Sequence, residues 1–132
     1  MILSSPWRTV AAVHATASCV ALLGIVRLSG VAVLPSFVRF GFRIDRQLRN
    51  TPGVFGYRIG ADVSGLAFYH LSAWKNSEAI QDFVDTAPHV DAVDQLGARL
   101  GETAFRYWQV TGADLPMHLR RELHRLQVKP ST

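Results

Sequence analysis

The sequence predicts an α+β fold of the ferredoxin-like type, a β-α-β-β-α-β sandwich with an additional C-terminal helix. Its 132 residues, 48% of them hydrophobic, suit one domain with a core of its own. Apolar runs of strand length alternate with stretches of helical periodicity, and proline, glycine or asparagine stands at the junctions. We expect a single domain over residues 19–132, preceded by an N-terminal arm at residues 1–18 to which the sequence assigns no definite structure.

The first strand and the first helix lie in the N-terminal half. Residues 20–28 form a continuous, β-branched apolar run, as expected of a strand that is buried on both faces. A helix should begin near Ser36, a favourable N-cap residue, and end before Pro52, because proline lacks a backbone donor. This helix should have an apolar face made of Phe37, Phe40, Gly41, Ile44 and Leu48. Its opposite face should be basic and carry Arg39, Arg43 and Arg46.

A hairpin and a helical segment should follow. Residues 53–61 and 66–74 read as strands joined by a short, turn-rich link, so antiparallel pairing is the economical arrangement. Asn76 can cap the next helix. A further helix should begin near Pro88, with an inward face made of Val90, Val93, Gly97 and Leu100.

Residues 103–112 are the predicted fourth strand, and Pro116 should open a terminal helix over residues 115–127. The order of elements is that of a four-stranded antiparallel sheet with helices on one face. Large aromatic residues occupy both faces of its strands, and an uncovered aromatic face is an aggregation hazard. We therefore expect a partner sheet to pack there, most simply in a homodimer with two-fold symmetry.

Composition argues against several other partners. The formal charge of +4 comes from dispersed arginines without lysine-rich blocks, so no nucleic-acid partner is expected. The lone Cys19 cannot form an internal disulfide, and the expected location is the cytoplasm. A signal peptide with Arg8 as its basic region is the alternative reading of the N-terminus, but residues 20–28 are needed as a strand. Arg121 and Arg125 accompany leucines in the terminal helix, yet docking on the sheet explains that pattern without membrane contact.

Three stretches carry a family resemblance: "TPGVFGYRIG", "FYHLSAWKNSEAIQDFVDTAPHVDAV" and "FRYWQVTG". Together they resemble the dimeric α+β barrel superfamily, which includes antibiotic-biosynthesis monooxygenases, heme-degrading monooxygenases and spheroidene monooxygenase. The pattern is most similar to the last of these, and it covers roughly residues 20 to 112. The resemblance implies the same fold and a homodimer. The superfamily also includes isomerases and decarboxylases, so the fold does not settle the reaction.

The resemblance also raises the question of heme. Trp74 stands where heme-degrading members place a tryptophan against the heme, but their iron-ligating histidine falls near Val93, which cannot ligate iron. The heme-degrading members also have an asparagine on the first strand, and the first strand of this sequence contains no asparagine. The "W...H..A" pattern of the heme-using spheroidene monooxygenase is matched by Trp74, His89 and Ala92. The resemblance therefore leaves two cofactor alternatives open, none or heme.

Histidines are the best candidates for chemistry. His89 should lie in the first turn of a helix, where the dipole disfavours imidazolium and leaves a neutral base or ligand; a plain capping role is the alternative. His70 shares one strand face with Phe68, Ser72 and Trp74. Either this face lines a cavity, or His70 is a buried structural histidine. The candidate catalytic residues are His89 and His70, and the candidate substrate-binding residues are Trp74, Tyr57, Ser72, Tyr107, Phe68 and Trp108.

Other site types lack support. Trp74 and Trp108 are also plausible core residues, because large aromatic side chains dominate cores. The spacing of His89, Asp91 and Asp94 scatters these residues around a helix, so no metal site is expected. The leading hypothesis is a monooxygenase-like enzyme acting on an aromatic, polyketide-like or isoprenoid substrate held between sheet and helices. The alternatives are a non-catalytic dimeric ligand-binding module and a heme-binding protein.

Overall fold

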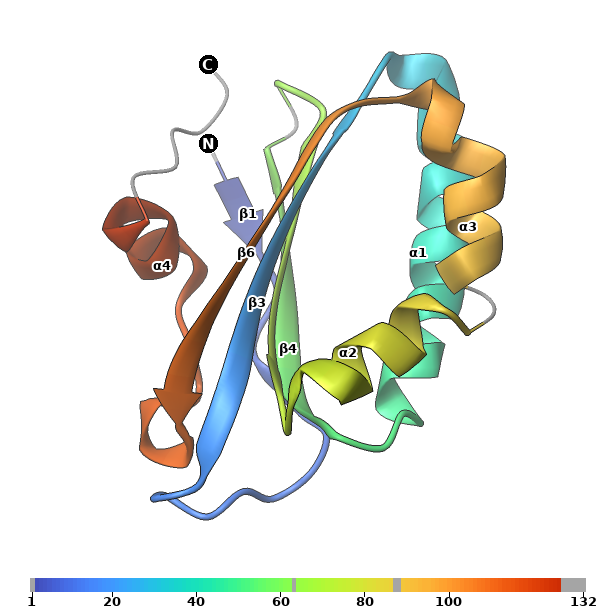
Figure 1. The fold of residues 1–132 in the computed structure, drawn as a ribbon. Coiled ribbons are helices and arrows are strands. Elements are labelled where there is room, and N and C mark those ends of the chain that lie inside the picture. Colours follow the sequence, from blue (N-terminus) through green and yellow to red (C-terminus); the bar gives the residue numbers. More distant parts are fainter. Residues whose placement is uncertain (1, 63, 87–88, 127–132) are drawn as a thin grey trace.

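The computed structural model describes residues 2–62, 64–86 and 89–126, and it is built around a six-stranded antiparallel sheet (Figure 1). The four predicted strands are β3 (Ser18–Leu28), β4 (Val54–Asp62), β5 (Ala67–Trp74) and β6 (Leu100–Thr111). They lie in the order β4-β5-β3-β6, and β4 and β5 form the predicted antiparallel hairpin. The α+β class and the ferredoxin-like order of elements are therefore confirmed.

The N-terminal arm, for which the sequence predicted no structure, extends this sheet. Strands β1 (Ile2–Ser4) and β2 (Arg8–Thr9) both pair antiparallel with β4, so that Ile2 lies opposite Asp62 and Arg8 opposite Tyr57. The arm covers the outer edge of β4 in this way. The opposite edge of the sheet is β6.

Helices α1 (Leu34–Arg49), α2 (Ser77–Val84) and α3 (His89–Leu96) cover one face of the sheet (Figure 1). Helix α1 follows a 3-10 turn, η1 (Val31–Val33), and begins before the predicted Ser36, because Pro35 fits the first turn of a helix. It ends at Arg49, ahead of Pro52 as predicted. The predicted cap of α2 is confirmed, since the Oδ1 atom of Asn76 accepts a hydrogen bond of 2.9 Å from the backbone N–H of Ala79.

The predicted inner face of α3 was wrong at Val93 and Gly97, whereas Leu100, at the start of β6, does pack against the core; the side chain of Val90 lies outside the described ones. Ala92 and Leu96 are buried against α1, whereas Val93 is 52% exposed and Gly97 lies in a 3-10 turn, η2 (Gly97–Arg99). The prediction favoured the bulky β-branched valine over the small alanine. Helix α3 packs close to α1, and a small side chain such as Ala92 permits that approach.

The second face of the sheet carries the terminal helix. Helix α4 (Leu119–Arg125) is shorter than the predicted 115–127. The residues between the turn η3 (Gly112–Asp114) and α4 are not helical, and one of them, Met117, is completely buried. Residue 127 is outside the described ranges. A core cluster joins this segment and α4 to β1, β3 and β5: Ile2, Ala21, Leu23, Ile25, Ala67, Tyr69, Leu71, Ala73, Met117, Leu119 and Leu123.

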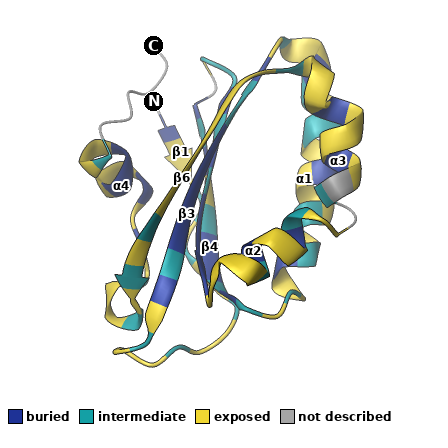
Figure 2. Cartoon of the chain, viewed as in Figure 1, coloured by how far each residue is buried: buried dark blue, intermediate teal, exposed yellow. Residues whose placement is uncertain are grey.

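Because α4 and the arm cover the middle of this face, the reason for expecting a partner sheet there does not hold (Figure 2). The homodimer itself stays a prediction. Within the described ranges no helix combines the length and the apolar character needed to cross a membrane.

Two further core clusters lie between the sheet and the helices. One surrounds Trp74 and includes Phe83 of α2 and Leu48 of α1. The other surrounds Phe40 of α1 and Leu96 of α3, and Phe68 packs against it. Since Phe68 and Trp74 belong to the same strand face, the residues between them, His70 and Ser72, lie between the two clusters.

Candidate functional site between the sheet and the helices

Two rows of residues cross the helix-facing side of the sheet. The register places Ile59, His70, Gly24 and Phe105 side by side in one row. The next row consists of Tyr57, Ser72, Leu22 and Tyr107. The structure thus brings six of the predicted site residues onto one face: Tyr57, Phe68, His70, Ser72, Trp74 and Tyr107.

Trp108 does not join them. It lies opposite Ala21, on the face that carries α4, and the guanidinium of Arg125 lies 4.9 Å from its ring centroid. Trp108 and Tyr107 are neighbours in a strand, so their side chains must point to opposite faces. The prediction assigned both residues to one site without using this alternation, and Trp108 is left out of the candidate site.

A hydrogen-bonded series of polar groups runs along β5. The indole Nε1–H of Trp74 donates to the hydroxyl of Ser72 at 2.7 Å, and the Ser72 Oγ lies 3.5 Å from Nδ1 of His70. Since the serine oxygen accepts from the indole, its own proton is free to be directed toward Nδ1. That arrangement puts the proton of a neutral His70 on Nε2, a buried atom that has no hydrogen-bond partner among the described residues.

The surroundings of His70 favour its neutral form. Burial, with the nearby His89 as a second cause, lowers the pKa of His70 from 6.5 to about 4, and Asp45 opposes this only in part. The ring also lies against that of Tyr57, with 6.0 Å between centroids and 24° between planes. His70 is therefore an uncharged polar group on a largely apolar wall.

Tyr57 links the sheet to α1. Its hydroxyl donates a short hydrogen bond to a carboxylate oxygen of Asp45, which also pairs with Arg49 at 3.2 Å. Burial first and Asp45 second raise the pKa of Tyr57, so the phenol stays protonated at neutral pH. Sequence reasoning missed Asp45; the available signal was a carboxylate directly after Ile44, at the border of the apolar stripe of α1.

His89 is held at the start of α3 by its neighbours. Its backbone N–H donates to the side-chain oxygen of Gln47 at 3.2 Å, and its Nδ1 lies 3.2 Å from the carbonyl oxygen of Val84. A carbonyl only accepts, so Nδ1 carries the proton and Nε2 keeps its lone pair. The ring packs on Phe83 at 5.1 Å, and burial lowers the pKa of His89.

The helix-dipole argument had predicted a neutral His89, and the direction of the pKa shift agrees with it. The cause is burial. Gln47, which the sequence analysis did not single out, also binds the carbonyl oxygens of Phe83 and Thr86, at 3.1 and 3.3 Å. It thereby fastens the segment that carries His89 to α1.

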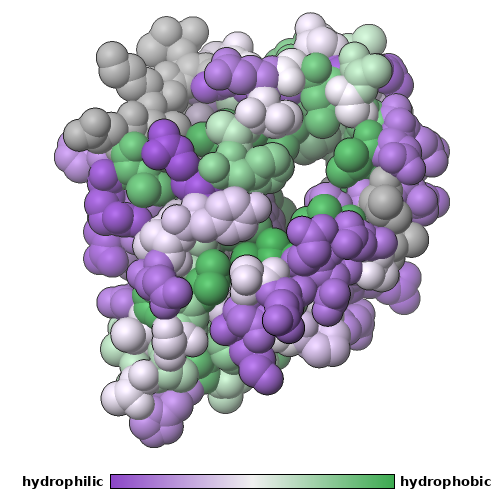
Figure 3. All heavy atoms as spheres, viewed as in Figure 1, coloured by the Kyte–Doolittle hydropathy of each residue, from purple (hydrophilic) through white to green (hydrophobic). Residues whose placement is uncertain are grey.

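The space next to these residues is open. Figure 3 shows a gap between the sheet and the helices, rimmed in part by hydrophobic residues. The row that contains His70 also contains Ile59 and Phe105, which are 43% and 56% exposed although they face the helical layer. A Cβ atom on Gly24 would lie 3.2 Å from the Phe105 ring and 4.0 Å from the Cβ of His70, so the absence of a side chain at Gly24 lets the Phe105 ring lie over the sheet beside His70.

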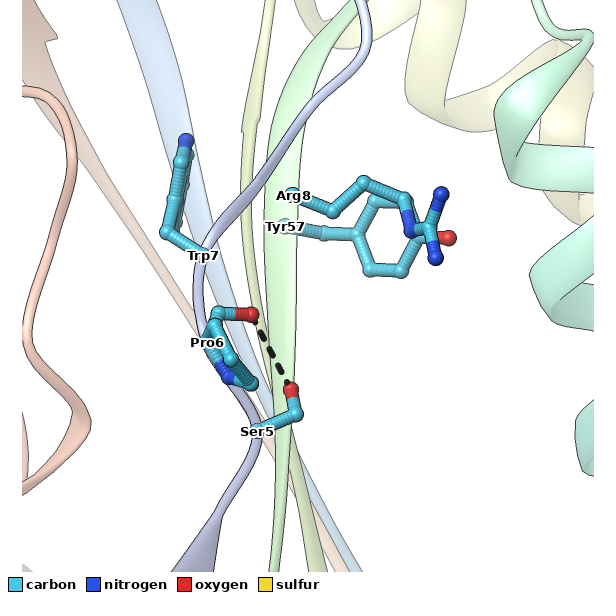
Figure 4. A pocket seen from close by; sticks show the side chains of 5 residues that line it. All are labelled: Ser5, Pro6, Trp7, Arg8 and Tyr57. Carbon is cyan, nitrogen blue, oxygen red and sulfur yellow. Dashed lines mark hydrogen bonds between the residues drawn. The ribbon is translucent and has the colours of Figure 1, made fainter.

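A second hollow of about 310 Å³ lies at the outer edge of β4, where the arm crosses the strand. Ser5, Pro6, Trp7, Arg8 and Tyr57 line it, and Figure 4 shows Arg8 and Tyr57 extending side by side in the direction of the helices. Tyr57 therefore separates this hollow from His70. Across the described part of the chain, no three metal-ligating side chains gather in one place.

No protein-family model matches the sequence, and no curated protein sequence matches it either. Solved structures do resemble it. A candidate monooxygenase from Fusobacterium nucleatum superposes with a TM-score of 0.66 at 12% identity, over 75% of this chain and 46% of that one. One from Lactobacillus acidophilus has a TM-score of 0.62 at 15% identity, over 76% and 50%. This chain thus spans about half the length of these two proteins.

A candidate antibiotic-biosynthesis monooxygenase from Deinococcus radiodurans is matched over 67% of this chain and 89% of its own, with a TM-score of 0.59 and 16% identity. Likeness at such identities concerns the backbone alone. The chain therefore has the α+β fold of the antibiotic-biosynthesis-monooxygenase-like proteins, in agreement with the resemblance of its sequence.

Proposed function

We propose that this protein is a monooxygenase-like enzyme that acts on an aromatic, polyketide-like or isoprenoid compound held between the sheet and the helices. The observation that supports this proposal best is His70, a neutral imidazole whose buried nitrogen has no partner among the described residues, on the sheet face that the helices cover. Small-molecule sites are typically apolar concavities with a few placed polar groups.

The walls fit a flat, apolar molecule. Phe68, Tyr107 and Phe105 all face the helices and none is fully buried, so aromatic surface is available to a ligand. Trp74, in contrast, is completely buried among core residues. Its proposed role is to hold Ser72 and His70 in place, and contact with the substrate is assigned to the three less buried aromatic residues.

The two histidines have different proposed roles. His89 keeps a lone pair on Nε2 and is proposed to accept the substrate proton. His70, with a pKa of about 4, is a weak base, and its Nε2–H is proposed to donate a hydrogen bond to a substrate oxygen once the ligand displaces the enclosing side chains. Together they would stabilise an enolate or phenolate.

Without a cofactor, the substrate must itself supply the electrons. A doubly activated CH₂ group loses a proton to His89, and the carbanion reduces dioxygen and forms a C–O bond. The O–O bond then breaks, so that CH₂ and O₂ become C=O and H₂O. This balance requires no external reductant, and it restricts the substrate to compounds with an acidic C–H bond, such as anthrone-like polyketides.

Heme is the second candidate, because the donor chemistry of His89 suits iron. Its Nδ1–H is hydrogen-bonded to a backbone carbonyl, the usual arrangement of a metal-ligating histidine, so Nε2 of His89 is the atom that would hold the iron. His70 does not suit this role, since its Nε2 is enclosed. When bound, heme would supply dioxygen activation, while the chain would bind and orient the substrate.

Absorption spectroscopy on the purified protein, before and after hemin is added, separates the two candidates. A sharp, saturable Soret shift that disappears in His89→Ala but persists in the exposed-histidine control His124→Ala would favour heme. If no shift occurs, oxygen uptake with a tricyclic anthrone is the next test. Uptake lost in His89→Ala and kept in His124→Ala supports cofactor-free oxygenation.

A third candidate, a ligand-binding module without catalysis, predicts a different result. Its apolar ligands would bind to His89→Ala with the wild-type affinity, and neither the wild type nor this variant would show oxygen uptake. The cofactor-free proposal is refuted if wild-type protein binds the anthrone and consumes no oxygen.

A further inference from the structure

We propose that the outer face of helix α1 binds the surface of a membrane that contains anionic lipids. This outer face consists of Val38, Arg39, Phe42, Arg46 and Arg49. The other four residues stand three, four or seven positions from Phe42, so all five side chains lie on one side of the helix. The inference is independent of the reaction proposed above, because it concerns the outside of the helical layer.

The two apolar residues of the outer face belong to none of the core clusters. Val38 is 43% exposed, and Phe42, at 72%, is the most exposed of the large apolar side chains that the structure describes. Phe40, which α1 buries in the cluster shared with α3, stands two positions from each of them. Two positions turn a helix through about 200°, so Val38 and Phe42 point almost directly away from this cluster. Folding therefore leaves their apolar surface in water, and an apolar medium would remove it.

Helix α4, the other helix that combines arginines with apolar residues, is different. Its leucines Leu119 and Leu123 are 1% and 3% exposed, so docking on the sheet accounts for its apolar stripe. Helix α1 also buries an apolar stripe, but it keeps Val38 and Phe42 outside. Only the apolar residues of α1 are thus left without a partner among the described residues.

The arginines of the outer face carry a net positive charge. Arg39 and Arg46 are exposed, and neither forms an ion pair with a described residue. Arg49 pairs with Asp45 at 3.2 Å, and Asp45 also accepts the hydrogen bond of the Tyr57 hydroxyl. The carboxylate is therefore directed toward the sheet and neutralises Arg49 alone. Two guanidinium groups without a carboxylate partner remain beside the exposed apolar side chains.

The acidic residues of the neighbouring helix lie on the other flank of α1. Asp91 and Asp94 are exposed on α3. Helix α3 packs beside α1 in the cluster where Leu96 and Phe40 are buried. Because Phe40 and Phe42 point in nearly opposite directions, α3 lies on the flank away from Phe42. A bilayer that receives Phe42 is consequently approached by the arginines and not by these two aspartates.

A bilayer surface offers both kinds of partner that the outer face requires. Anionic headgroups attract arginines, and the acyl chains beneath them take up apolar side chains, as with other basic amphipathic helices. The aliphatic stems of the arginines can lie along the same apolar layer. A nucleic acid supplies negative charge but no apolar layer for Val38. With only two apolar side chains involved, the binding should be reversible and should weaken as salt is added.

Flotation with lipid vesicles tests the proposal. The full chain should float with vesicles of phosphatidylcholine mixed with an equal amount of phosphatidylglycerol, but not with vesicles of phosphatidylcholine alone, and added salt should release it. Arg39→Glu should weaken binding by about ten-fold or more, because it replaces an attractive charge with a repulsive one. Arg121→Glu makes the same charge change on the exposed side of α4, across the sheet, and should leave binding within about two-fold of the wild type (Figure 1).

The apolar part of the contact is tested separately. Phe42→Ser should weaken binding by about five-fold or more, whereas Val93→Ser, at a side chain 52% exposed on α3, should not. Phe42→Cys, labelled with an environment-sensitive dye, should give blue-shifted emission on the anionic vesicles, and the same label on Val93→Cys should not. The native Cys19 is buried, so the label is directed to the new thiol. Far-UV circular dichroism checks that each variant is folded.

Three results would overturn the proposal. The first is a wild-type protein that does not float with the anionic vesicles. The second is binding that Arg39→Glu weakens and Phe42→Ser leaves unchanged, since charge alone would then explain it and any polyanion could be the partner. The third is binding that Arg121→Glu or Val93→Ser weakens as strongly as the changes on α1, because the contact would then lie elsewhere.

Discussion

The indole N–H of Trp74 donates a hydrogen bond to the hydroxyl of Ser72 at 2.7 Å, and both side chains are completely buried. Two polar groups on one strand thus satisfy each other inside the core. Ser72→Ala would leave the indole N–H without a partner and should lower the free energy of unfolding by about 1–3 kcal/mol. Urea denaturation measures the change.

A double-mutant cycle separates the contribution of this hydrogen bond to stability from the contribution of side-chain packing. Ser72→Ala should cost much less in a Trp74→Phe background, where no indole N–H remains to be orphaned. Equal losses in the two backgrounds would show that the bond contributes nothing beyond the volume of the serine. Trp108→Phe, on the other sheet face, is a control background with the tryptophan bond intact.

Acid should destabilise the fold through its buried histidines. The pKa of His70 is lowered to about 4, and that of His89 is lowered as well, so between pH 4 and 6.5 the unfolded chain binds more protons than the folded one. Stability contributed by the neutral ring is therefore present above pH 6.5 and lost as the pH falls toward 4. His70 accounts for on the order of 2 kcal/mol between pH 7 and 4.5.

Thermal or urea unfolding at these two pH values measures the loss. His70→Gln should flatten the pH dependence, and the exposed His124→Gln should leave it unchanged. A proton NMR titration that places the His70 pKa near 6.5 would contradict the proposed burial of this ring.

A large side chain at Gly24 should displace the Phe105 ring and prevent ligand binding beside His70. A side chain at Gly24 would grow from a Cβ position 3.2 Å from the Phe105 ring and 4.0 Å from the His70 Cβ. Gly24→Leu should weaken binding of an anthrone by about ten-fold or more while the protein stays folded, since Phe105 is exposed and can move aside. Fluorescence titration gives the affinity, and far-UV circular dichroism checks the fold.

Gly41→Leu is the matched control, because nothing lies within 4 Å of a Cβ built there. Unchanged anthrone affinity in Gly24→Leu would mean that the ligand binds elsewhere, for example in the hollow beside Arg8.

Helix α4 should be essential to stability although it is short. Leu119 is 1% exposed and packs in the cluster that contains Leu23 and Leu71. Leu119→Ala should lower the free energy of unfolding by about 2–5 kcal/mol, as large-to-small changes in cores do. The exposed Val38→Ala on α1 should change it by about 0.5 kcal/mol or less. A small effect at Leu119 would mean that α4 is only loosely docked.

Much of the fold could be predicted because local patterns determine it. The β-branched run of β3, the turn between β4 and β5, and the cap at Asn76 depend on neighbours in the chain. The arm could not be predicted in this way, since β1 and β2 are strands only by pairing with β4, which lies much further along the chain: Ile2 pairs with Asp62 and Arg8 with Tyr57. Short edge strands take their structure from the sheet they join.

The candidate site was predictable to the extent that strand alternation determines it. His70, Ser72 and Trp74 follow from a spacing of two, and the same spacing, applied to β6, would have excluded Trp108. Asp45 and Gln47 escaped notice because their partners, Tyr57 and the start of α3, come from other elements. Contacts between residues of different helices and strands depend on how these elements pack together, and a single sequence does not reveal that packing.

The position of α4 also affects how the chain leaves the ribosome. The apolar strip of β3 and β5 on the α4 side is complete once residue 74 has been made, but Met117, Leu119 and Leu123 appear only after residues 75–116. At roughly 5–20 residues per second, that strip stays uncovered for several seconds in every round of synthesis. Nascent chains therefore present a hydrophobic surface that the finished protein conceals, and a chaperone that binds apolar strands has this interval in which to act.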